Sequence, residues 1–194
     1  MSNNLAYQDE FQQHIRQEQI DGRVFMTSPR PAWNHNQVAG NIYRLFANHL
    51  YGSKCVPIAD GMDLFLSEEN HFVPDFMAVC DPDKIKMDGV YGAPDLVVEV
   101  LSPSTAKNDR GPKKAAYAKA GVQEYWIVSP NEKFVEVYRA NQGEFSLHDL
   151  YTLRQDWELA RMTEKERAEV VFHFQCSLFD DLDIALEDIF YRTF

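Results

Sequence analysis

The chain lacks the features that would place it in a membrane or in a standard nucleotide-binding class. It has no apolar run approaching the roughly 18–20 residues that a membrane-spanning helix needs, and its amino end has neither the basic start nor the apolar stretch of a signal peptide. Its nine glycines form no dinucleotide-binding or P-loop pattern. We therefore expect a cytoplasmic protein that has no contact with a membrane and no glycine loop for phosphates.

Cysteine and basic residues are also scarce. The three cysteines, Cys55, Cys80 and Cys176, form no C-x-x-C pair, which predicts buried or half-buried thiols in a reducing compartment and argues against a cysteine-bound zinc. The 19 lysines and arginines face 30 acids, so the net charge of −11 counts against an avid DNA binder. A nuclease remains open, because acids at a metal site attract phosphate once divalent cations occupy them.

The composition is that of one globular domain spanning residues 1–194, since a chain that is 45% hydrophobic can bury one good core. Hydrophobic spacing predicts a helix over about residues 7–19 and a longer amphipathic helix over about residues 33–51. An antiparallel meander is expected next, with strands at residues 55–59, 62–66 and 72–79.

The middle of the chain predicts a strand, a helix and another strand. Residues 95–101 are almost unbroken in their apolar character, which is typical of a central strand buried on both faces. A helix should follow from residue 108 or 109 to Ala120, with Gly121 as its stop signal. Further strands are expected at residues 125–128, 133–138 and 144–151, and a short helix at residues 186–190.

Two acids interrupt these apolar strands, Asp75 and Glu99. An unpaired buried carboxylate costs several kcal/mol, so such acids need a cation or a proton partner. On one strand Asp95 and Glu99 share a face, so both could reach one edge of a site. If the strand carrying Asp75 pairs beside Glu99, a single hard cation, Mg²⁺ or Mn²⁺, could bridge the two carboxylates.

A lysine on the next helix could complete this site. The strand itself offers Leu101 two residues after Glu99, so it supplies no lysine there. On the helix, Lys113 and Tyr117 lie on one face and Lys114 is turned about 100° away. The ammonium group of Lys113 could orient an attacking water, lower its pKa and offset charge on the phosphate.

Each of these residues also has a purely structural interpretation. Asp75 and Asp95 each follow a proline at a strand entrance, where an aspartate often caps a turn. Glu99 could form a buried ion pair with Lys113 or Arg110 and take no part in catalysis. Both interpretations of Glu99 predict a contact with Lys113.

Other polar residues near the predicted site carry weaker signals. His35 begins the long helix and could point toward the site or serve as a surface or capping residue. Tyr117 is expected to pack in the core, with base stacking as the alternative. Ser102 and Ser104 lack the Gly-x-Ser-x-Gly elbow of a nucleophile, so helix capping explains them better.

Several motifs in the middle of the chain resemble one protein family. They are Pro74-Asp75, Gly92-Ala-Pro-Asp-Leu-Val-Val-Glu-Val-Leu-Ser-Pro-Ser-Thr105, Asp109-Arg-Gly-Pro-Lys113, Tyr117-Ala-Lys-Ala-Gly-Val122 and Glu124-Tyr-Trp-Ile-Val-Ser-Pro130. Together they resemble the Uma-two family of restriction-endonuclease-like proteins, which has a PD-(D/E)XK nuclease-like fold. The resemblance implies an α/β (α+β) fold with a mixed sheet flanked by helices.

The same resemblance implies roles for individual residues. Asp75 and Glu99 match the metal-binding acids of the superfamily, and Lys113 matches a lysine that has migrated from the strand to the helix. The chain departs from the family pattern at Ser129, where an aspartate is usual, and at Pro112, where a glutamate is usual. Neither departure removes a proposed metal ligand, but Pro112 affects how Lys113 is oriented.

Two functions remain open. The first is a Mg²⁺-dependent or Mn²⁺-dependent endonuclease that hydrolyses DNA with Asp75, Glu99 and Lys113, with His35, Asp95 and Tyr117 as accessory residues. The second is a non-catalytic interaction or regulatory module that keeps the nuclease-like core, which the acidic charge would suit. Cutting both strands of a duplex needs two sites, so a homodimer is expected for the first function.

Overall fold

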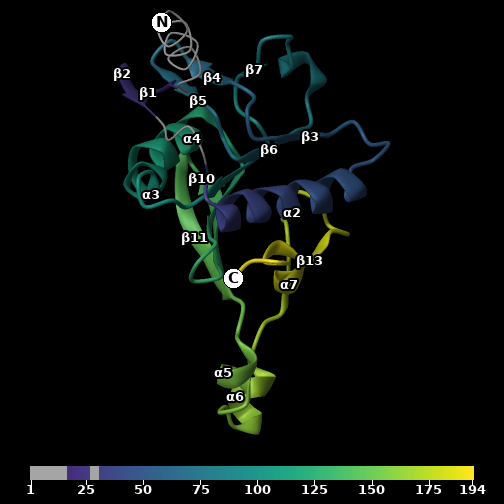
Figure 1. Cartoon of the computed structure of the whole chain (residues 1–194). Coiled ribbons are helices and arrows are strands. Elements are labelled where there is room, and N and C mark those ends of the chain that lie inside the picture. Colours follow the sequence, from purple (N-terminus) through teal and green to yellow (C-terminus); the bar gives the residue numbers. More distant parts are fainter. Residues whose placement is uncertain (1–16, 27–30) are drawn as a thin grey trace, which may run out of the picture.

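The computed structural model describes residues 17–26 and 31–194 and is built around a six-stranded sheet (Figure 1). The strand order is β11-β10-β9-β8-β6-β3. These strands are β3 (Val56–Ala59), β6 (Phe76–Val79), β8 (Leu96–Val100), β9 (Glu124–Ser129), β10 (Phe134–Asn141) and β11 (Glu144–Thr152). Only β8 and β9 pair in parallel, and the other neighbours are antiparallel. The expected mixed sheet with flanking helices is confirmed.

β8 is the central strand that the apolar run predicts, since all five of its residues are buried. Because side chains alternate along a strand, Val98 packs into a core on one face of the sheet and Val97 into a core on the other. The first core is covered by α2 (Trp33–His49), whose inward residues include Ile42 and Phe46. The short C-terminal helix α7 (Leu186–Ile189) packs on the same side.

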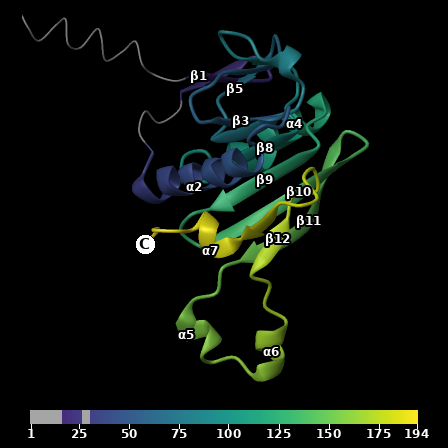
Figure 2. The same cartoon turned by 90° about the vertical axis from the view of Figure 1, so that its right-hand side faces the viewer.

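The opposite face of the central sheet is covered by a second, five-stranded sheet and a helix (Figure 2). The order of the second sheet is β2-β1-β5-β4-β7. Its strands are β1 (Gln17–Ile20), β2 (Arg23–Met26), β4 (Leu64–Ser67), β5 (Asn70–Phe72) and β7 (Val90–Tyr91). The helix on this side is α4 (Lys114–Ala120), whose Tyr117 is buried in the second core.

The expected antiparallel meander is wrong, because its strands belong to two sheets. β3 pairs with β6 in the central sheet, whereas β4 pairs with β5 in the second sheet. The predicted strand over residues 72–79 is also divided in two, since β5 ends at Phe72 and β6 begins at Phe76. Pro74 lies in the gap and has no N–H for a strand ladder, so the chain can leave one sheet there and enter the other.

The expected helix at the amino end falls mostly outside the described residues. Its last part, residues 17–19, is not helical but belongs to β1, which pairs with β2 as a hairpin. Asp21 and Gly22 form the two-residue turn, with φ of 48° and 76°. Two successive positive φ values are typical of the tight turn that matches the twist of a hairpin, so the turn residues override the helical spacing.

The helix after β8 is less regular than its sequence predicts. It consists of α3 (Ala106–Asn108), a π-helical turn (Asp109–Lys113) and α4. The break lies at Gly111, which has non-helical dihedral angles (φ −114°, ψ −105°), because the following Pro112 disfavours the helical conformation of the residue before it and cannot donate a backbone hydrogen bond. The helix ends as predicted, with Gly121 in the left-handed conformation at φ 100°.

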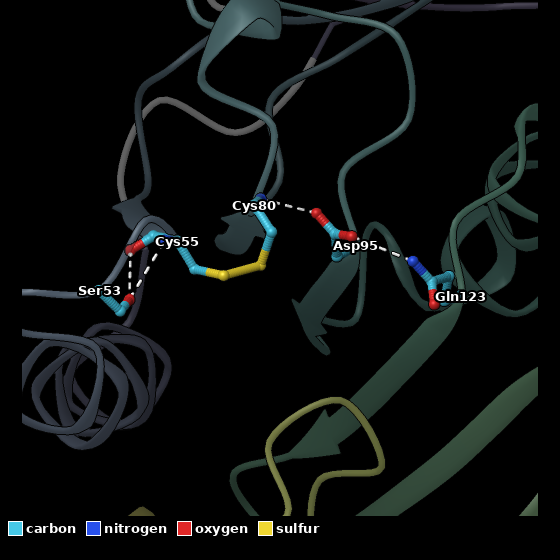
Figure 3. The surroundings of a disulfide bond; sticks show 5 residues. All are labelled: Ser53, Cys55, Cys80, Asp95 and Gln123. Carbon is cyan, nitrogen blue, oxygen red and sulfur yellow. Dashed lines mark hydrogen bonds between the residues drawn. A yellow bond between two sulfur atoms is a disulfide. The ribbon is translucent and has the colours of Figure 1, made fainter.

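Two of the three cysteines form a disulfide, Cys55–Cys80, so the expectation of thiols at these positions is wrong (Figure 3). Val56 pairs with Val79, and the same antiparallel register places Cys55 opposite Cys80 just beyond the strand ends. The sequence separation of 25 residues conceals this proximity. Cys176 is a buried free thiol as expected. The inference of a reducing compartment loses part of its support, because disulfides persist mainly in oxidising environments.

After β11 the chain first extends away from the two sheets and then returns to pack against the central sheet. Helices α5 (Asp156–Leu159) and α6 (Glu164–Ala168) lie on a loop that extends away from the sheets (Figures 1 and 2). The chain then forms the two-stranded sheet β12 (His173–Gln175) and β13 (Asp183–Ala185) before α7. Among the helices of the described residues, none combines the length and apolar character needed to cross a membrane.

Candidate active site

A cleft of about 290 Å³ opens beside the carboxyl end of β8. It lies between the start of α2 and the segment that leads into α3. Its polar lining residues are Glu18, Asn34, His35, Asp60, Asp75, Glu99, Ser102, Ser104, Thr105, Lys113 and Asn131. Of the described lysines and arginines, only Lys113 lines this cleft, and the acids there outnumber it.

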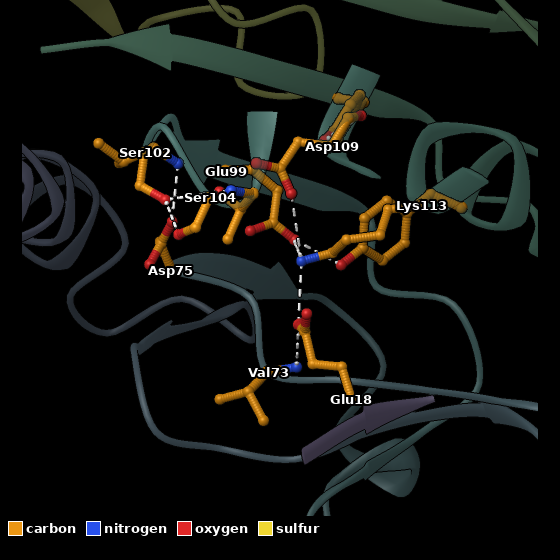
Figure 4. Close-up of polar contacts among 12 residues, drawn as sticks. Glu18, Val73, Asp75, Glu99, Ser102, Ser104, Asp109 and Lys113 are labelled. Atoms are coloured by element: carbon orange, nitrogen blue, oxygen red, sulfur yellow. Dashed lines mark hydrogen bonds and ion pairs between the residues drawn. The ribbon is translucent and has the colours of Figure 1, made fainter. Parts of the chain in front are cut away.

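Sheet register brings the two predicted metal-binding acids together. Phe76 pairs with Val98, and the same antiparallel register places Asp75, one residue before β6, opposite Glu99. Directly opposed residues of an antiparallel pair project to the same face of a sheet. The Oδ2 atom of Asp75 also accepts a hydrogen bond of 2.7 Å from the backbone N–H of Val100, beside Glu99 (Figure 4). The condition set by the sequence, that the Asp75 segment pairs beside Glu99, is met.

Lys113 lies against Glu99 at the inner end of the cleft. Its Nζ atom is 2.7 Å from Oε1 of Glu99, and the side chains of both residues are almost fully buried. Tyr117, one helical turn further on, donates its hydroxyl hydrogen to the same Oε1 atom over 2.7 Å. Lys113 and Tyr117 therefore lie on the same helical face, as predicted, and both side chains contact Glu99. Arg110, the alternative ion-pair partner, pairs with Glu136 instead.

Tyr117 has the core position that its sequence predicts. Its ring packs against those of Phe72 and Tyr125, with centroids 5.0 Å and 5.3 Å away. Burial raises the pKa of Tyr117 well above its usual range, and the charge of Glu99 adds to this effect. Tyr117 is therefore a neutral hydrogen-bond donor that holds one oxygen of Glu99 in place.

Two further carboxylates contact Lys113, and sequence analysis did not include them in the site. Oε1 of Glu18 is 2.9 Å from Nζ, and Oδ1 of Asp109 is 3.5 Å from it (Figure 4). Glu18 was assigned to a helix, although its alternation with Ile20 is the signal of an inward strand position. The signal for Asp109 was its spacing of four residues from Lys113, which places the two side chains on the same helical face.

Asp109 is unusual because its carboxylate is buried beside other acids, with Lys113 and the side chain of Thr105 as the groups that favour its charge. The side chain is 1% exposed, and Lys113 is the cation that it faces. Burial raises the pKa of Asp109, while Lys113 acts in the opposite direction. The backbone carbonyl of Asp109 accepts a hydrogen bond from the hydroxyl of Tyr125, which fixes this turn of the helix.

The electrostatics of the site follow from an excess of acids over cations. Burial raises the pKa of Glu99 well above its usual range; Lys113 opposes this, and the charges of Asp109, Asp75 and Glu18 reinforce it. Burial alone would lower the pKa of Lys113, but Glu99, Glu18 and Asp109 together hold it well above its usual range. Lys113 is thus a permanent ammonium. The acids around it carry more negative charge than Lys113 offsets, so this group of acids favours binding a proton or a further cation.

His35 reaches the same place from the first turn of α2. Its Nε2 atom is 3.4 Å from Oδ2 of Asp75, and both side chains are largely buried. Burial by itself would lower the pKa of His35, but the hydrogen bond and charge of Asp75 outweigh it and the pKa is raised. The other ring nitrogen, Nδ1, is buried with no hydrogen-bond partner in the described part of the chain. Of the two sequence-based alternatives for His35, the structure has the one that points toward the site.

Asp95 is not brought to the cleft, and the expectation that it shares an edge with Glu99 is corrected. It lies at the other end of β8, where Oδ2 accepts the N–H of Cys80 and Oδ1 accepts the side-chain amide of Gln123 (Figure 3). Four residues of extended strand span about 13 Å, so a shared face does not give a shared site. Asp95 has the turn-capping role that its position after a proline indicated.

Of the two serines after β8, Ser102 accepts a backbone hydrogen bond in the turn before α3, whereas the N-cap residue of α3 is Thr105, without a side-chain cap. The backbone N–H of Thr105 donates a hydrogen bond to Oγ of Ser102 over 3.3 Å. The hydroxyls of Ser104 and Thr105 each lie 3.0 Å from the same atom. These contacts stabilise the turn that leads into α3.

The described residues of the cleft can hold a hard cation that keeps several of its waters, but they do not form a closed coordination shell around it. No three histidine, cysteine, aspartate or glutamate side chains within residues 17–26 and 31–194 gather closely enough to hold a metal by themselves. The hydrogen bonds and ion pairs of Asp75 use its Oδ2 atom, and those of Glu99 use Oε1, so the second oxygen of each is the candidate ligand. Mg²⁺ keeps several waters and is often held by one or two carboxylates, which this pair can supply.

Comparison with known proteins identifies relatives of this chain. A model of the Uma2 family, described as "Putative restriction endonuclease", matches residues 4–168. An uncharacterized protein of Synechocystis, slr1290, is 34% identical over 134 residues, which cover 68% of this chain and 70% of that protein. A second uncharacterized Synechocystis protein, sll1609, is 29% identical over 136 residues, or 68% of this chain and 76% of that protein.

A solved structure shares the fold. It is the crystal structure of a "putative nuclease belonging to DUF820" from Anabaena variabilis, with a TM-score of 0.68. The likeness covers 94% of this chain and 96% of that one at 18% sequence identity. The two proteins therefore have the same fold, with little sequence in common.

Proposed function

Because the chain belongs to the Uma2 family of restriction-endonuclease-like proteins, we propose that it is a divalent-cation-dependent nuclease that hydrolyses phosphodiester bonds of DNA. The observation that carries the proposal is the contact of Lys113 with Glu99 at the inner end of an open cleft, with Asp75 in register opposite. Hydrolysis at phosphorus requires a cation, a positioned water and positive charge near the phosphate. In this cleft the two acids could hold the cation, and the lysine could position the water and supply the charge.

We assign the cation to Asp75 and Glu99, and Mg²⁺ or Mn²⁺ suits their oxygen ligands. When bound, the cation would supply positive charge to the phosphate and so reduce the repulsion between the substrate and this acidic cleft. The protein contributes the orientation of its carboxylates. The N–H of Val100 and the imidazole of His35 hold Asp75, while the hydroxyl of Tyr117 holds Glu99.

Lys113 has the central catalytic role in this proposal. Its ammonium lies within hydrogen-bond distance of Glu99 and faces the cleft, so it can donate to an attacking water and orient it toward the phosphorus. It can also offset the charge that develops on the phosphate oxygens. Because Lys113 stays protonated, it acts as a donor and a charge, and the base that accepts the proton of water must be another group.

The experiment compares cleavage of plasmid and single-stranded DNA, with and without Mg²⁺ or Mn²⁺, by the native protein and four variants. Asp75→Asn, Glu99→Gln and Lys113→Ala should each reduce the rate by at least about 100-fold, the loss typical of removing one catalytic donor or ligand. Asp95→Asn, on the same strand but outside the cleft, is the matched control and should stay within a few-fold of the native rate. Unaltered activity in both Asp75→Asn and Lys113→Ala rules out the assignment.

A non-catalytic interaction or regulatory module is the second candidate. The net charge of −11 and the full engagement of Lys113 by carboxylates favour it. Thermal melting in increasing Mn²⁺ separates the two, since ligand binding to the folded state raises the melting temperature. The nuclease predicts a rise that Glu99→Ala abolishes, whereas the module predicts no rise and no cleavage.

The number of active sites in the assembly determines whether one or both strands of a duplex can be cut. Cleavage of both strands of a duplex requires two active sites, so we propose a twofold dimer as the form that cuts duplex DNA. Analytical ultracentrifugation with and without a DNA duplex measures this. A monomer that nevertheless makes double-strand breaks in one encounter contradicts the dimer.

A further inference from the structure

The amine of Lys113 has more partners than a single ion pair requires. A lysine ammonium has three N–H donors, and three carboxylates surround this one at 2.7 Å (Glu99), 2.9 Å (Glu18) and 3.5 Å (Asp109). If the second oxygen of Glu99 binds a cation, the negative charge of Glu99 is shared between that cation and Lys113, so its hold on Lys113 weakens. The amine then depends on the other two acids to keep its position.

Glu18 is the better fixed of those two acids. Its side chain is 5% exposed, and its Oε1 atom accepts two hydrogen bonds, one from Nζ of Lys113 and one of 3.1 Å from the backbone N–H of Val73. Asp109 lies further from the amine, with Oδ1 3.5 Å from Nζ, at the outer limit of hydrogen-bond length. A short side chain in an irregular helical turn is thus a weaker anchor than Glu18.

Glu18 also binds the backbone N–H of Val73, in a second element of the site. Val73 lies in the short segment between β5 and β6, two residues before Asp75. Figure 4 shows Glu18 extending from β1 toward Nζ of Lys113, with the backbone of Val73 beside it. One carboxylate oxygen therefore joins the helix that supplies the lysine to the segment that supplies an acid.

We propose that Glu18 is a positioning residue, which holds the amine of Lys113 and the Val73-Pro74-Asp75 segment at a constant separation when Glu99 binds a cation. This inference rests on the proposed nuclease function. Glu18 acts through Lys113 and Asp75, and it is neither a cation ligand nor a proton carrier in this role. Its loss should therefore reduce the rate of cleavage more than the binding of cation or DNA.

The test uses Glu18→Gln, which keeps an acceptor for both hydrogen bonds and removes the charge, and Glu18→Ala, which removes both. We expect kcat to fall about 10-fold in Glu18→Gln and about 100-fold in Glu18→Ala, as for mispositioned catalytic groups. The Mn²⁺ concentration at half of the maximal melting shift should change less than about 3-fold, and KM for DNA should change as little. Amide hydrogen exchange at Val73 should accelerate in Glu18→Ala and stay near native in Glu18→Gln.

A matched control is Glu136→Gln, another buried carboxylate in a salt bridge, because neither Glu136 nor its partner Arg110 lines the cleft. It should leave kcat unchanged. Native kcat in both Glu18 variants, with Lys113→Ala inactive, overturns the role of Glu18 and leaves the nuclease standing. Equal losses of kcat in Glu18→Gln and Glu136→Gln overturn it as well, since they indicate a general loss of stability. A native protein that cleaves no DNA with either cation overturns both proposals together.

Discussion

The two ends of β8 each carry an acid on the same face of the strand, and their surroundings are opposite in kind. At the first end, Asp95 receives neutral donors, the N–H of Cys80 at 2.7 Å and the amide of Gln123 at 3.0 Å, one on each oxygen. The Cys55–Cys80 disulfide lies beside it (Figure 3). At the second end, Glu99 shares one ammonium with other buried acids and faces a cleft.

This difference separates an acid with a structural role from the acid that we propose as a cation ligand. A carboxylate with a neutral donor on each oxygen is satisfied, and it stabilises the turn that it caps. Glu99, by contrast, has a pKa raised by burial and by neighbouring acids, although Lys113 opposes this. Both ends carry a carboxylate on the same strand face, so the neighbours supplied by other parts of the chain are what give Asp95 and Glu99 different surroundings.

The largest expected effect comes from removing the cation at the Glu99 end. Lys113→Met keeps the volume of the side chain and leaves Glu18, Glu99 and Asp109 buried without a counterion. Breaking a buried pair in this way typically costs about 3–5 kcal/mol of unfolding free energy at neutral pH. Chemical denaturation of the native protein and the variant measures the difference. A loss below about 1 kcal/mol would mean that these acids are already neutral or solvated.

The pH dependence of that loss gives a second check on the same variant. Lys113 lowers the pKa of Glu99 and Asp109, so its removal raises both further above their usual values of about 4.5 and 3.8. An acid with a raised folded-state pKa contributes stability below its unfolded pKa and loses it as the pH rises. The variant should therefore lose stability relative to the native protein as the pH rises above the folded-state pKa values of Glu99 and Asp109 in the native protein. A difference that stays constant as the pH rises contradicts the assignment.

A smaller effect is expected at the Asp95 end, from the disulfide. In the chain-entropy model, opening a loop of 25 residues costs about 3.5 kcal/mol of unfolding free energy. We expect this loss in the double variant Cys55→Ala, Cys80→Ala, measured by chemical denaturation. The rise in melting temperature with Mn²⁺ should persist in the variant, because this end of β8 does not line the cleft. Loss of the Mn²⁺ response would show that the two ends are coupled.

The smallest effect belongs to the pair of His35 and Asp75. The pKa of His35 is raised above its usual 6.5, so its contribution to stability is complete below about pH 6.5 and is lost as the pH rises through the folded-state value. His35→Gln should therefore cost more at pH 6 than at pH 8, by less than about 1 kcal/mol, as for ion pairs near a surface. Asp75→Asn should remove the same pH dependence. A cost that increases toward pH 8 would contradict the sign.

Much of this site could be predicted from local patterns. The apolar run around Glu99 predicted a central strand, and the four-residue spacing of Lys113 and Tyr117 predicted a shared helical face. Both predictions depend on neighbours along the chain. Glu18 and the Cys55–Cys80 pair could not be found in this way, because their partners are distant in sequence and come from other elements.

The amino-acid sequence by itself determined the central strand around Glu99, the end of the following helix at Gly121, and which acids lie on apolar strands. These features depend on backbone conformation and on the alternation of side chains, which are local. The tertiary structure decided which acid faces the cleft and which caps a turn, and it brought Glu18 and Asp109 to one lysine. The energy of a buried charge depends on everything within a few ångströms, and those neighbours are assembled only when the sheets pack.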